Sequence, residues 1–219
     1  MEKKYKLLVD DTITVGNRTL YRIEALRDFA DVRKGDKGGY VESEDNLSHD
    51  GNCWVSDNAR IYGNAVVCDS AVVCDNAVVY GNAVVCDSAK VYGNAEVCGN
   101  AVVCGNAVVC DNAEVFGNAV VCGSAKVYGN AEVFGNAVVC GNAVVCDNAD
   151  YYVGKNIWSS GRYFTYTRSN RMWKVGCFYG TGEELIKKAY QDSEVSGREY
   201  KRVVEYVEAM YADLEKDKE

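Results

Sequence analysis

A six-residue repeat without insertions most limits how this chain can fold. From Gly51 to Tyr152 the sequence divides into 17 hexapeptides of the form [GD]-[NS]-A-x-V-[CYF]. The apolar positions miss the 3.6-residue spacing of an α-helix. They suit short strands with Ala and Val inward and with x and the last residue outward. The Gly-Asn, Asp-Asn and Asp-Ser pairs predict tight corners, so three edges close a triangular coil of 18 residues.

The repeat resembles that of the hexapeptide-repeat proteins. Their phrase places an aliphatic residue four positions before a small one, as Val103 precedes Ala107 and Val109 precedes Ala113. The resemblance covers about half of the chain and implies an all-β, left-handed parallel β-helix over residues 51–152. General physics favours right-handed crossovers, so the left-handed coil is implied by the resemblance alone.

The two flanking segments predict a cap at each end of the coil. Residues 1–50 contain two β patterns, KYKLLV and TLYRIEAL, joined by a VGNR turn, and they predict an N-terminal β cap with a lead-in loop. Residues 153–219 predict a small α+β module. Its hairpin has strands at about 163–167 and 172–178, and its helices follow capping boxes at 181–184 and 196–199.

Both flanks also resemble parts of known proteins. The segment from LYRIEAL to NLSHDGNCW resembles the start of bacterial and bacteriophage hexapeptide-repeat proteins, some of which are labelled acyltransferases on fold analogy alone. The stretch from YFTYTRSN to VGCFYGTGEEL resembles a module that follows such repeats in phage and prophage proteins. These resemblances imply a bacterial or phage-encoded protein and supply no mechanism.

The coil period assigns the outward side chains to three faces. Hexapeptides beginning at 63, 81, 99, 117 and 135 all read GNAVVC, so the first face is wholly apolar. The second face alternates Val-Cys with Lys-Tyr. The third combines acidic with aromatic residues and is predicted to be a solvated face, the alternative being a surface for a basic partner or a cation.

The apolar first face predicts self-association as a dimer or trimer, because monomers seldom expose such a patch. The alternative is that the C-terminal segment of the chain covers this face. The predicted interface residues are Val66, Cys68, Val84, Cys86, Val102, Cys104, Val120, Cys122, Val138 and Cys140.

The cysteines admit chemical interpretations as well as a packing one. Stacked thiols one coil apart have a spacing compatible with disulfides, and thiolates suit soft metals such as Cu(I) or Zn(II). The repeat has no CxxC pair, the only histidine is His49, and a straight column does not converge four ligands tetrahedrally. We therefore expect no metal and no cofactor, with the cysteines acting as small outward hydrophobes.

Charge and hydropathy limit the partners. The net charge is −8, and residues 51–150 hold 10 acidic and three basic residues, so ordinary nucleic-acid binding is not expected. There is no apolar run long enough for a membrane span, and MEKKYK is not followed by the apolar core of a signal peptide. We expect a cytoplasmic protein with reduced thiols and no membrane partner.

For function, these observations favour a non-catalytic, self-associating scaffold or binding protein. The resemblance implies an alternative, an acyltransferase with an acyl-CoA donor and a catalytic histidine, but the coils contain no histidine and His49 precedes them. The other alternative is a phage counter-defence protein that captures a host protein or an anionic, nucleotide-type ligand. Candidate ligand-binding residues are the basic and aromatic cluster Arg162, Tyr166, Arg168, Arg171, Trp173 and Lys174.

Overall fold

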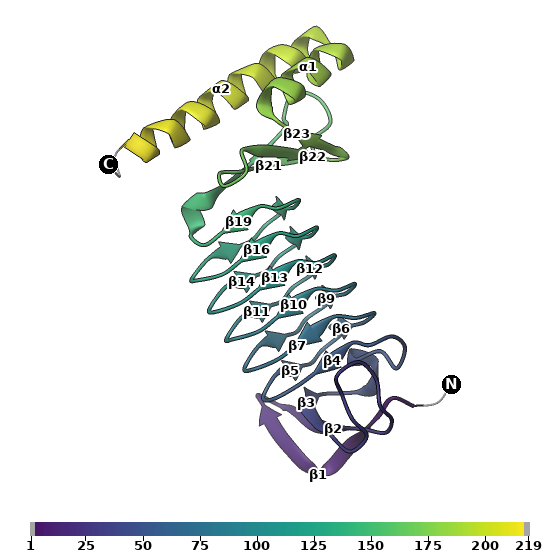
Figure 1. Cartoon of the computed structure of the whole chain (residues 1–219). Coiled ribbons are helices and arrows are strands. Elements are labelled where there is room, and N and C mark those ends of the chain that lie inside the picture. The colour runs from purple at the N-terminus through teal and green to yellow at the C-terminus, as the bar shows by residue number, and fades with distance from the viewer. Residues whose placement is uncertain (1–2, 217–219) are drawn as a thin grey trace.

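The computed structural model describes residues 3–216 as a coil of short strands with a cap at each end (Figure 1). The N-terminal cap is an antiparallel hairpin of β1 (Tyr5–Val15) and β2 (Arg18–Ala25), which is extended by β3 (Lys37–Val41). β3 pairs in parallel with β5 (Arg60–Ile61), the first coil strand of its sheet. The hairpin thereby covers a sheet edge that would otherwise expose unpaired backbone groups.

The hexapeptide region forms sixteen two-residue strands, β4 to β19, in three parallel sheets. Each strand pairs with those one coil away, as Val102 pairs with Val84 and Val120. The first sheet contains β6 (Val66–Val67), β9 (Val84–Val85), β12 (Val102–Val103), β15 (Val120–Val121) and β18 (Val138–Val139). The second contains β4 (Trp54–Val55), β7 (Val72–Val73), β10 (Lys90–Val91), β13 (Val108–Val109), β16 (Lys126–Val127) and β19 (Val144–Val145). The third contains β5, β8 (Val78–Val79), β11 (Glu96–Val97), β14 (Glu114–Val115) and β17 (Glu132–Val133). The predicted parallel β-helix is confirmed.

The interior of the coil is built from alanine and valine. From Ala65 to Val145, the third and fifth residues of every hexapeptide are 0% exposed. Because each coil contributes side chains of the same size, successive coils have the same cross-section and stack directly. Removing these apolar groups from water, at about 25 cal/mol per Å², is the main favourable contribution to the stability of the coil.

The corners use left-handed backbone, which is the reason for the Gly or Asp that opens each hexapeptide. Asp75 has φ +59° and Gly93 has φ +73°. Aspartate is one of the few side-chain-bearing residues that adopt this region. It also satisfies the next corner, since the Asp75 carboxylate accepts the Gly93 N–H at 2.9 Å and the Asp87 carboxylate accepts the Gly105 N–H at 2.9 Å.

The last hexapeptide, residues 147–152, departs from the coil. Asp150 ends a single 3₁₀ turn (η2, Asn148–Asp150), and its carboxylate accepts the N–H groups of Cys146 at 2.8 Å and Asp147 at 3.0 Å. The chain continues as β20 (Tyr151–Lys155), antiparallel to β21 (Tyr163–Thr167). The regular coils therefore end at β19, and Asp150 and Tyr152 do not extend the third face as the repeat predicts.

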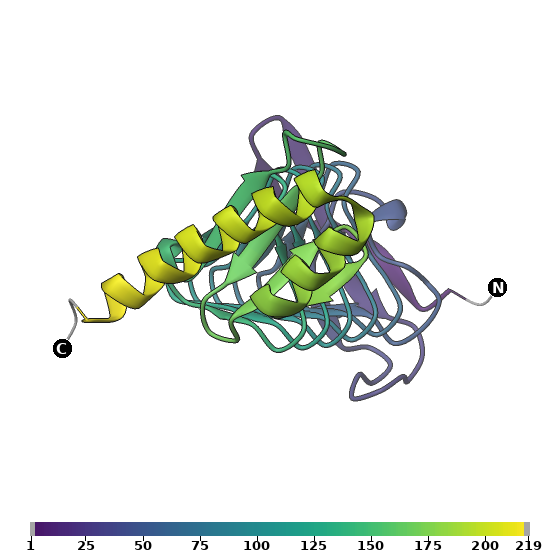
Figure 2. The ribbon, with the colours of Figure 1, turned by 90° about the horizontal axis from the view of Figure 1, so that it is seen from above.

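The C-terminal module lies across the end of the coil. Its antiparallel sheet has the order β20-β21-β22-β23, with β22 at Met172–Val175 and β23 at Phe178–Gly180. Helices α1 (Gly182–Asp192) and α2 (Glu194–Lys216) cover the outer side of this sheet (Figure 2). On its inner side, the Thr165 hydroxyl accepts the Val138 N–H at 2.9 Å and the Ser169 hydroxyl accepts the Val144 N–H at 2.7 Å.

The helix boundaries agree in part with the sequence. Thr181 caps α1 through a capping box with Glu184, as predicted. The predicted start of α2 at Ser196 is wrong, because the helix begins at Glu194 and the Ser193 hydroxyl accepts the Ser196 N–H at 3.1 Å. Neither described helix combines the length with the apolar character that crossing a membrane requires.

Candidate interaction surfaces

The first sheet carries an outward surface made of valine and cysteine alone. We call it the Val/Cys face, and it consists of Val66, Cys68, Val84, Cys86, Val102, Cys104, Val120, Cys122, Val138 and Cys140. The valines lie on the strands and the cysteines directly after them. In-register pairing stacks each type into a straight column. The structure thus brings all ten residues predicted for the interface onto one face.

A ladder of asparagine amides runs along the edge where these strands begin. Asn64 donates to Asn82 and Asn82 donates to Asn100, both at 2.9 Å. Asn100 donates to Asn118 at 3.0 Å. Such a ladder satisfies each amide with the coil above and the coil below. It holds successive coils in one register, which keeps the Val/Cys face straight.

The C-terminal module covers the Val/Cys face at its last coil. Cys140 is 8% exposed, and its carbonyl accepts a hydrogen bond from the Tyr179 hydroxyl at 3.4 Å. The members of the face from Val66 to Val138 stay partly exposed. The alternative in which the C-terminal segment covers the whole face is wrong, because the module packs across the end of the coil instead of along its side (Figure 1).

The thiols of this face titrate abnormally. Burial, together with neighbouring Asp69, raises the pKa of Cys68 to about 12. Burial and neighbouring Cys104 raise the pKa of Cys86 to about 11. At the end of the column, contact with Cys122 lowers the pKa of Cys140, opposed by burial and helped by the Lys174 ammonium. Cys68 and Cys86 are therefore protonated near neutral pH, and a protonated thiol packs as a small hydrophobe.

The second sheet presents exposed charge beside its valines. Lys90 and Lys126 are exposed and lie one strand to either side of Val108. Cysteines alternate with tyrosines in the neighbouring column, so Cys74 and Cys110 are separated by Tyr92. This face, unlike the Val/Cys face, has no continuous apolar surface.

The third sheet presents carboxylates and stacked aromatic rings. The rings of Tyr62 and Tyr80 stack with centroids 5.0 Å apart, and those of Phe116 and Phe134 with centroids 5.4 Å apart. The Tyr80 hydroxyl donates to the Glu96 carboxylate at 2.6 Å. Glu96, Glu114 and Glu132 thus follow one another in one column beside an aromatic one, as predicted. Arg60 and Val78 occupy the first two places of the acidic column, and Cys98 interrupts the aromatic one.

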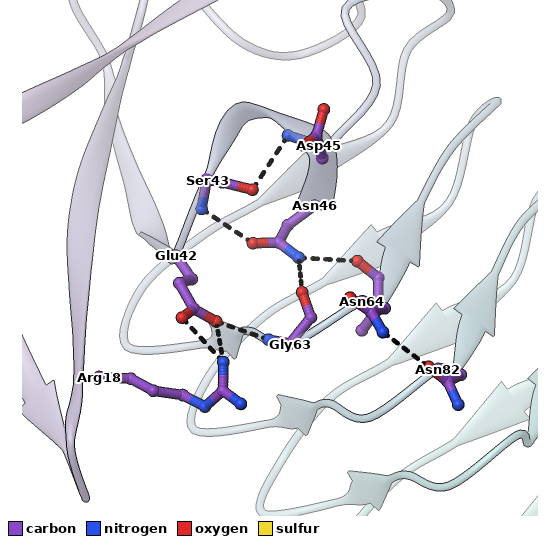
Figure 3. Close-up of polar contacts among 9 residues, drawn as sticks. Arg18, Glu42, Ser43, Asp45, Asn46, Gly63, Asn64 and Asn82 are labelled. Atoms are coloured by element: carbon purple, nitrogen blue, oxygen red, sulfur yellow. Dashed lines mark hydrogen bonds and ion pairs between the residues drawn. The ribbon is translucent and has the colours of Figure 1, made fainter.

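Glu42 and Asn46 join the N-terminal cap to the first coil (Figure 3). The Glu42 carboxylate accepts the Gly63 N–H at 2.7 Å and pairs with the Arg18 guanidinium at 2.7 Å. Asn46 is fully buried, and its amide donates to the carbonyls of Gly63 at 3.0 Å and Ala65 at 2.9 Å. The side chains of Glu42 and Asn46 therefore satisfy backbone groups of the first coil, and we assign this corner a structural role.

The structure brings together only part of the predicted basic and aromatic cluster, since Tyr166, Arg168 and Arg171 line neighbouring hollows and Arg162 lines a separate one. Tyr166 and Trp173 are buried between the sheet and the helices, and the Trp173 indole donates to the Glu208 carboxylate at 3.1 Å. Their alternation with polar residues along the strands turns the rings toward α1 and α2. Trp173 is thus fully buried inside the module, whereas Tyr166 also lines a hollow that it shares with Arg171. A role in ligand binding for these two residues stays a prediction.

Of the four basic members of that cluster, Arg168 and Arg171 reach the same carboxylate, whereas Arg162 and Lys174 lie apart from them. Arg168 and Arg171 both pair with Glu215 at 3.5 Å, and Arg171 lines a hollow of about 350 Å³ that also contains Glu183 and Glu208. Lys174 lies beside the Cys122–Cys140 end of the Val/Cys face. Arg162 lines a separate hollow of about 490 Å³ with Lys188. A role in ligand binding for these four stays a prediction.

His49 and Cys53 serve the N-terminal cap. The His49 ring stacks on Tyr5 with centroids 4.3 Å apart, and its Nδ1 accepts the Lys4 N–H at 3.2 Å. The Lys4 ammonium is fully buried and donates to the carbonyl of Cys53 at 2.9 Å and of Asp50 at 3.3 Å. Sequence patterning missed Lys4, because nothing in MEKKYK distinguishes the lysine that becomes buried.

Comparison with known protein families agrees with this geometry. The model of the YdcK beta solenoid repeat matches three overlapping segments, residues 55–69, 59–75 and 71–87, which lie within the first coils. A comparison with curated proteins gives no significant match. The three matches span residues 55–87, and together with the parallel sheets and the constant 18-residue register they support a parallel β-helix built from hexapeptide repeats.

Proposed function

We propose that this protein is a non-catalytic scaffold that self-associates through the Val/Cys face. The observation that carries the proposal is the exposure of this face: nine of its ten side chains stay partly exposed, and none carries a charge. Partly exposed valine and cysteine columns leave a continuous apolar surface in water, and such surfaces on folded proteins mark interaction sites.

The partner that fits best is a second copy of the chain. A twofold axis through the middle strand, β12, places the columns of one copy against the columns of the other. Such an interface requires that each residue contact in one direction be repeated in the other. The five identical GNAVVC hexapeptides meet this requirement, because each strand of the face presents the same outward pair, one valine and one cysteine.

The size of the face sets the expected affinity. Five strands about 4.8 Å apart make a face roughly 20 Å tall, which buries a few hundred Å² per copy. A standard interface buries about 800 Å² per partner, so this one falls in the weak class. We therefore expect a reversible dimer with a Kd on the order of micromolar or weaker.

We propose a non-catalytic protein because its histidine lies in the N-terminal cap and not on the coils. His49 is the one histidine of the chain, and it packs on Tyr5 and accepts a backbone N–H within the N-terminal cap. An acyltransferase mechanism that uses a histidine on the coils has no residue to fill that role.

Val102→Lys tests the proposed interface. This change places a charge at the centre of the apolar face, where a partner would have to desolvate it, so we expect the dimer to dissociate at least tenfold more readily. Sedimentation equilibrium over a range of concentrations measures the mass, which for a single chain is 24.0 kDa.

Val108→Lys is the matched control. It makes the same change at the same hexapeptide position on the second sheet, between Lys90 and Lys126, and is expected to leave the mass unchanged. A wild-type protein that stays at the mass of one chain at several hundred micromolar would refute the proposal. Equal loss of association in both variants would place the interface elsewhere.

A further inference from the structure

We propose that neighbouring thiols on the Val/Cys face, with Cys68 and Cys86 as the first pair, bind Cu(I) as a linear bis-thiolate. The five cysteines follow in-register strands, so each stands one coil from the next. The sulfur atoms of Cys68 and Cys86 and a carboxylate oxygen of Asp69 all lie within 4.8 Å of one another. Packing alone would not require two sulfur atoms and a carboxylate oxygen to lie this close together.

The spacing of the thiols matches two-coordinate geometry. In a linear site the two sulfurs lie on opposite sides of the ion, and metal–thiolate bonds of about 2.3 Å place them about 4.6 Å apart. Neighbouring strands are separated by about 4.8 Å. A tetrahedral Zn(II) site needs four converging ligands, which a straight column does not supply, whereas soft Cu(I) is selected by thiolates.

The charges around the pair suit a monovalent cation. Binding converts two thiols and one Cu(I) ion into a Cu(I) bis-thiolate and two released protons, with no change in the oxidation state of sulfur or copper. The Cys68 thiol donates to the Asp69 carboxylate at 3.3 Å, so a negative charge already lies beside the sulfur pair. That carboxylate attracts a cation placed between the sulfurs, and affinity is expected to rise with pH because protons are displaced.

The second sheet provides an internal comparison. There Cys74, Cys110 and Cys146 alternate with Tyr92 and Tyr128, so its thiols are two coils apart. Two coils correspond to about 9.6 Å, which no single ion bridges. The proposal therefore concerns adjacency within a column and not the number of cysteines in the chain.

Two double variants of the Val/Cys face test whether copper binding depends on neighbouring thiols or only on the number of thiols. Cys86→Ser with Cys122→Ser leaves three thiols in the column, none of them neighbours. Cys68→Ser with Cys140→Ser also leaves three thiols, and these are consecutive. The full-length proteins are titrated with Cu(I) without oxygen, after a thiol assay confirms full reduction, in competition with a chromogenic Cu(I) chelator. Ultraviolet thiolate-to-copper absorption provides the second readout.

If each ion needs two neighbouring thiols, the five consecutive thiols of the wild type should bind about two Cu(I) ions tightly. The three consecutive thiols of C68S/C140S should bind about one, and the separated thiols of C86S/C122S should bind none on this face. Loss of ultraviolet absorption should follow the same order. Equal copper binding by the two double variants would overturn the proposal, as would a wild type that fails to compete with the chelator. The mass measured on the same samples keeps this outcome separate from that of the self-association test.

Discussion

At the corners of the coil, a single residue satisfies two needs. Asp75 adopts φ +59° and at the same time accepts the Gly93 N–H at 2.9 Å. Glycine at the same place meets the backbone requirement without strain but leaves that N–H to water. The alternation of Gly and Asp at corners is thus a balance between backbone freedom and one hydrogen bond.

Replacing Asp75 by alanine should cost more than replacing it by glycine. Alanine keeps the side-chain penalty of the left-handed region and loses the acceptor, so we expect D75A to lower the free energy of unfolding by about 2 kcal/mol. D75G removes the strain along with the acceptor and should lower it by less than about 1 kcal/mol. Urea unfolding followed by circular dichroism measures both, and equal values would show that the left-handed backbone at this corner costs a side chain nothing.

Among the elements, the N-terminal cap depends on Asn46 more than on any rung of the exposed ladder (Figure 3). Asn46 is 0% exposed and donates to two carbonyls, and its own amide oxygen accepts the Ser43 N–H at 2.9 Å. Asn64 is exposed and donates only to Asn82 within the ladder. The same residue type therefore contributes differently at neighbouring levels of one edge.

We expect Asn46→Ala to lower the free energy of unfolding by about 3 kcal/mol, because it leaves buried backbone groups without partners. Asn64→Ala, the matched control, should cost about 0.5 kcal/mol, because water replaces the lost bond. Thermal and urea unfolding measure the difference. Similar costs for the two variants would show that the coil does not depend on the cap at this corner.

The sequence predicts the coils, which follow from the six-residue repeat. It misses features that depend on how separate elements pack against one another. The coils follow from the repeat because each residue meets its own equivalent 18 residues away. Asp150 belongs to the repeat by its letters, but its carboxylate turns back to accept the N–H groups of Cys146 and Asp147 where no further coil follows. Tyr166 and Trp173 look like surface aromatics until the helices are placed over them. Asn46 could have been found, since it stands 18 residues before Asn64.

For the whole molecule, charge opposes the proposed self-association. The chain carries a net charge of −8, and the Val/Cys face carries none of it, so two copies repel each other without compensating ion pairs at the contact. Raising the salt concentration from about 10 mM to about 500 mM shortens the screening length from about 30 Å to less than about 8 Å. We expect the dimer to tighten several-fold, as measured by sedimentation. Weakening by salt would indicate an interface with paired charges on another face.

The uniform coils also bear on how the length of the molecule is determined. Val102 meets valine on both neighbouring strands, and the Asn100 amide meets asparagine above and below. No coil in the middle of the first sheet can be told from its neighbours by its own contacts. A gene that gained or lost the codons for one complete coil would still encode a chain whose junctions fit. The contacts within the first sheet therefore do not determine the number of coils, whereas each cap makes contacts that no inner coil repeats.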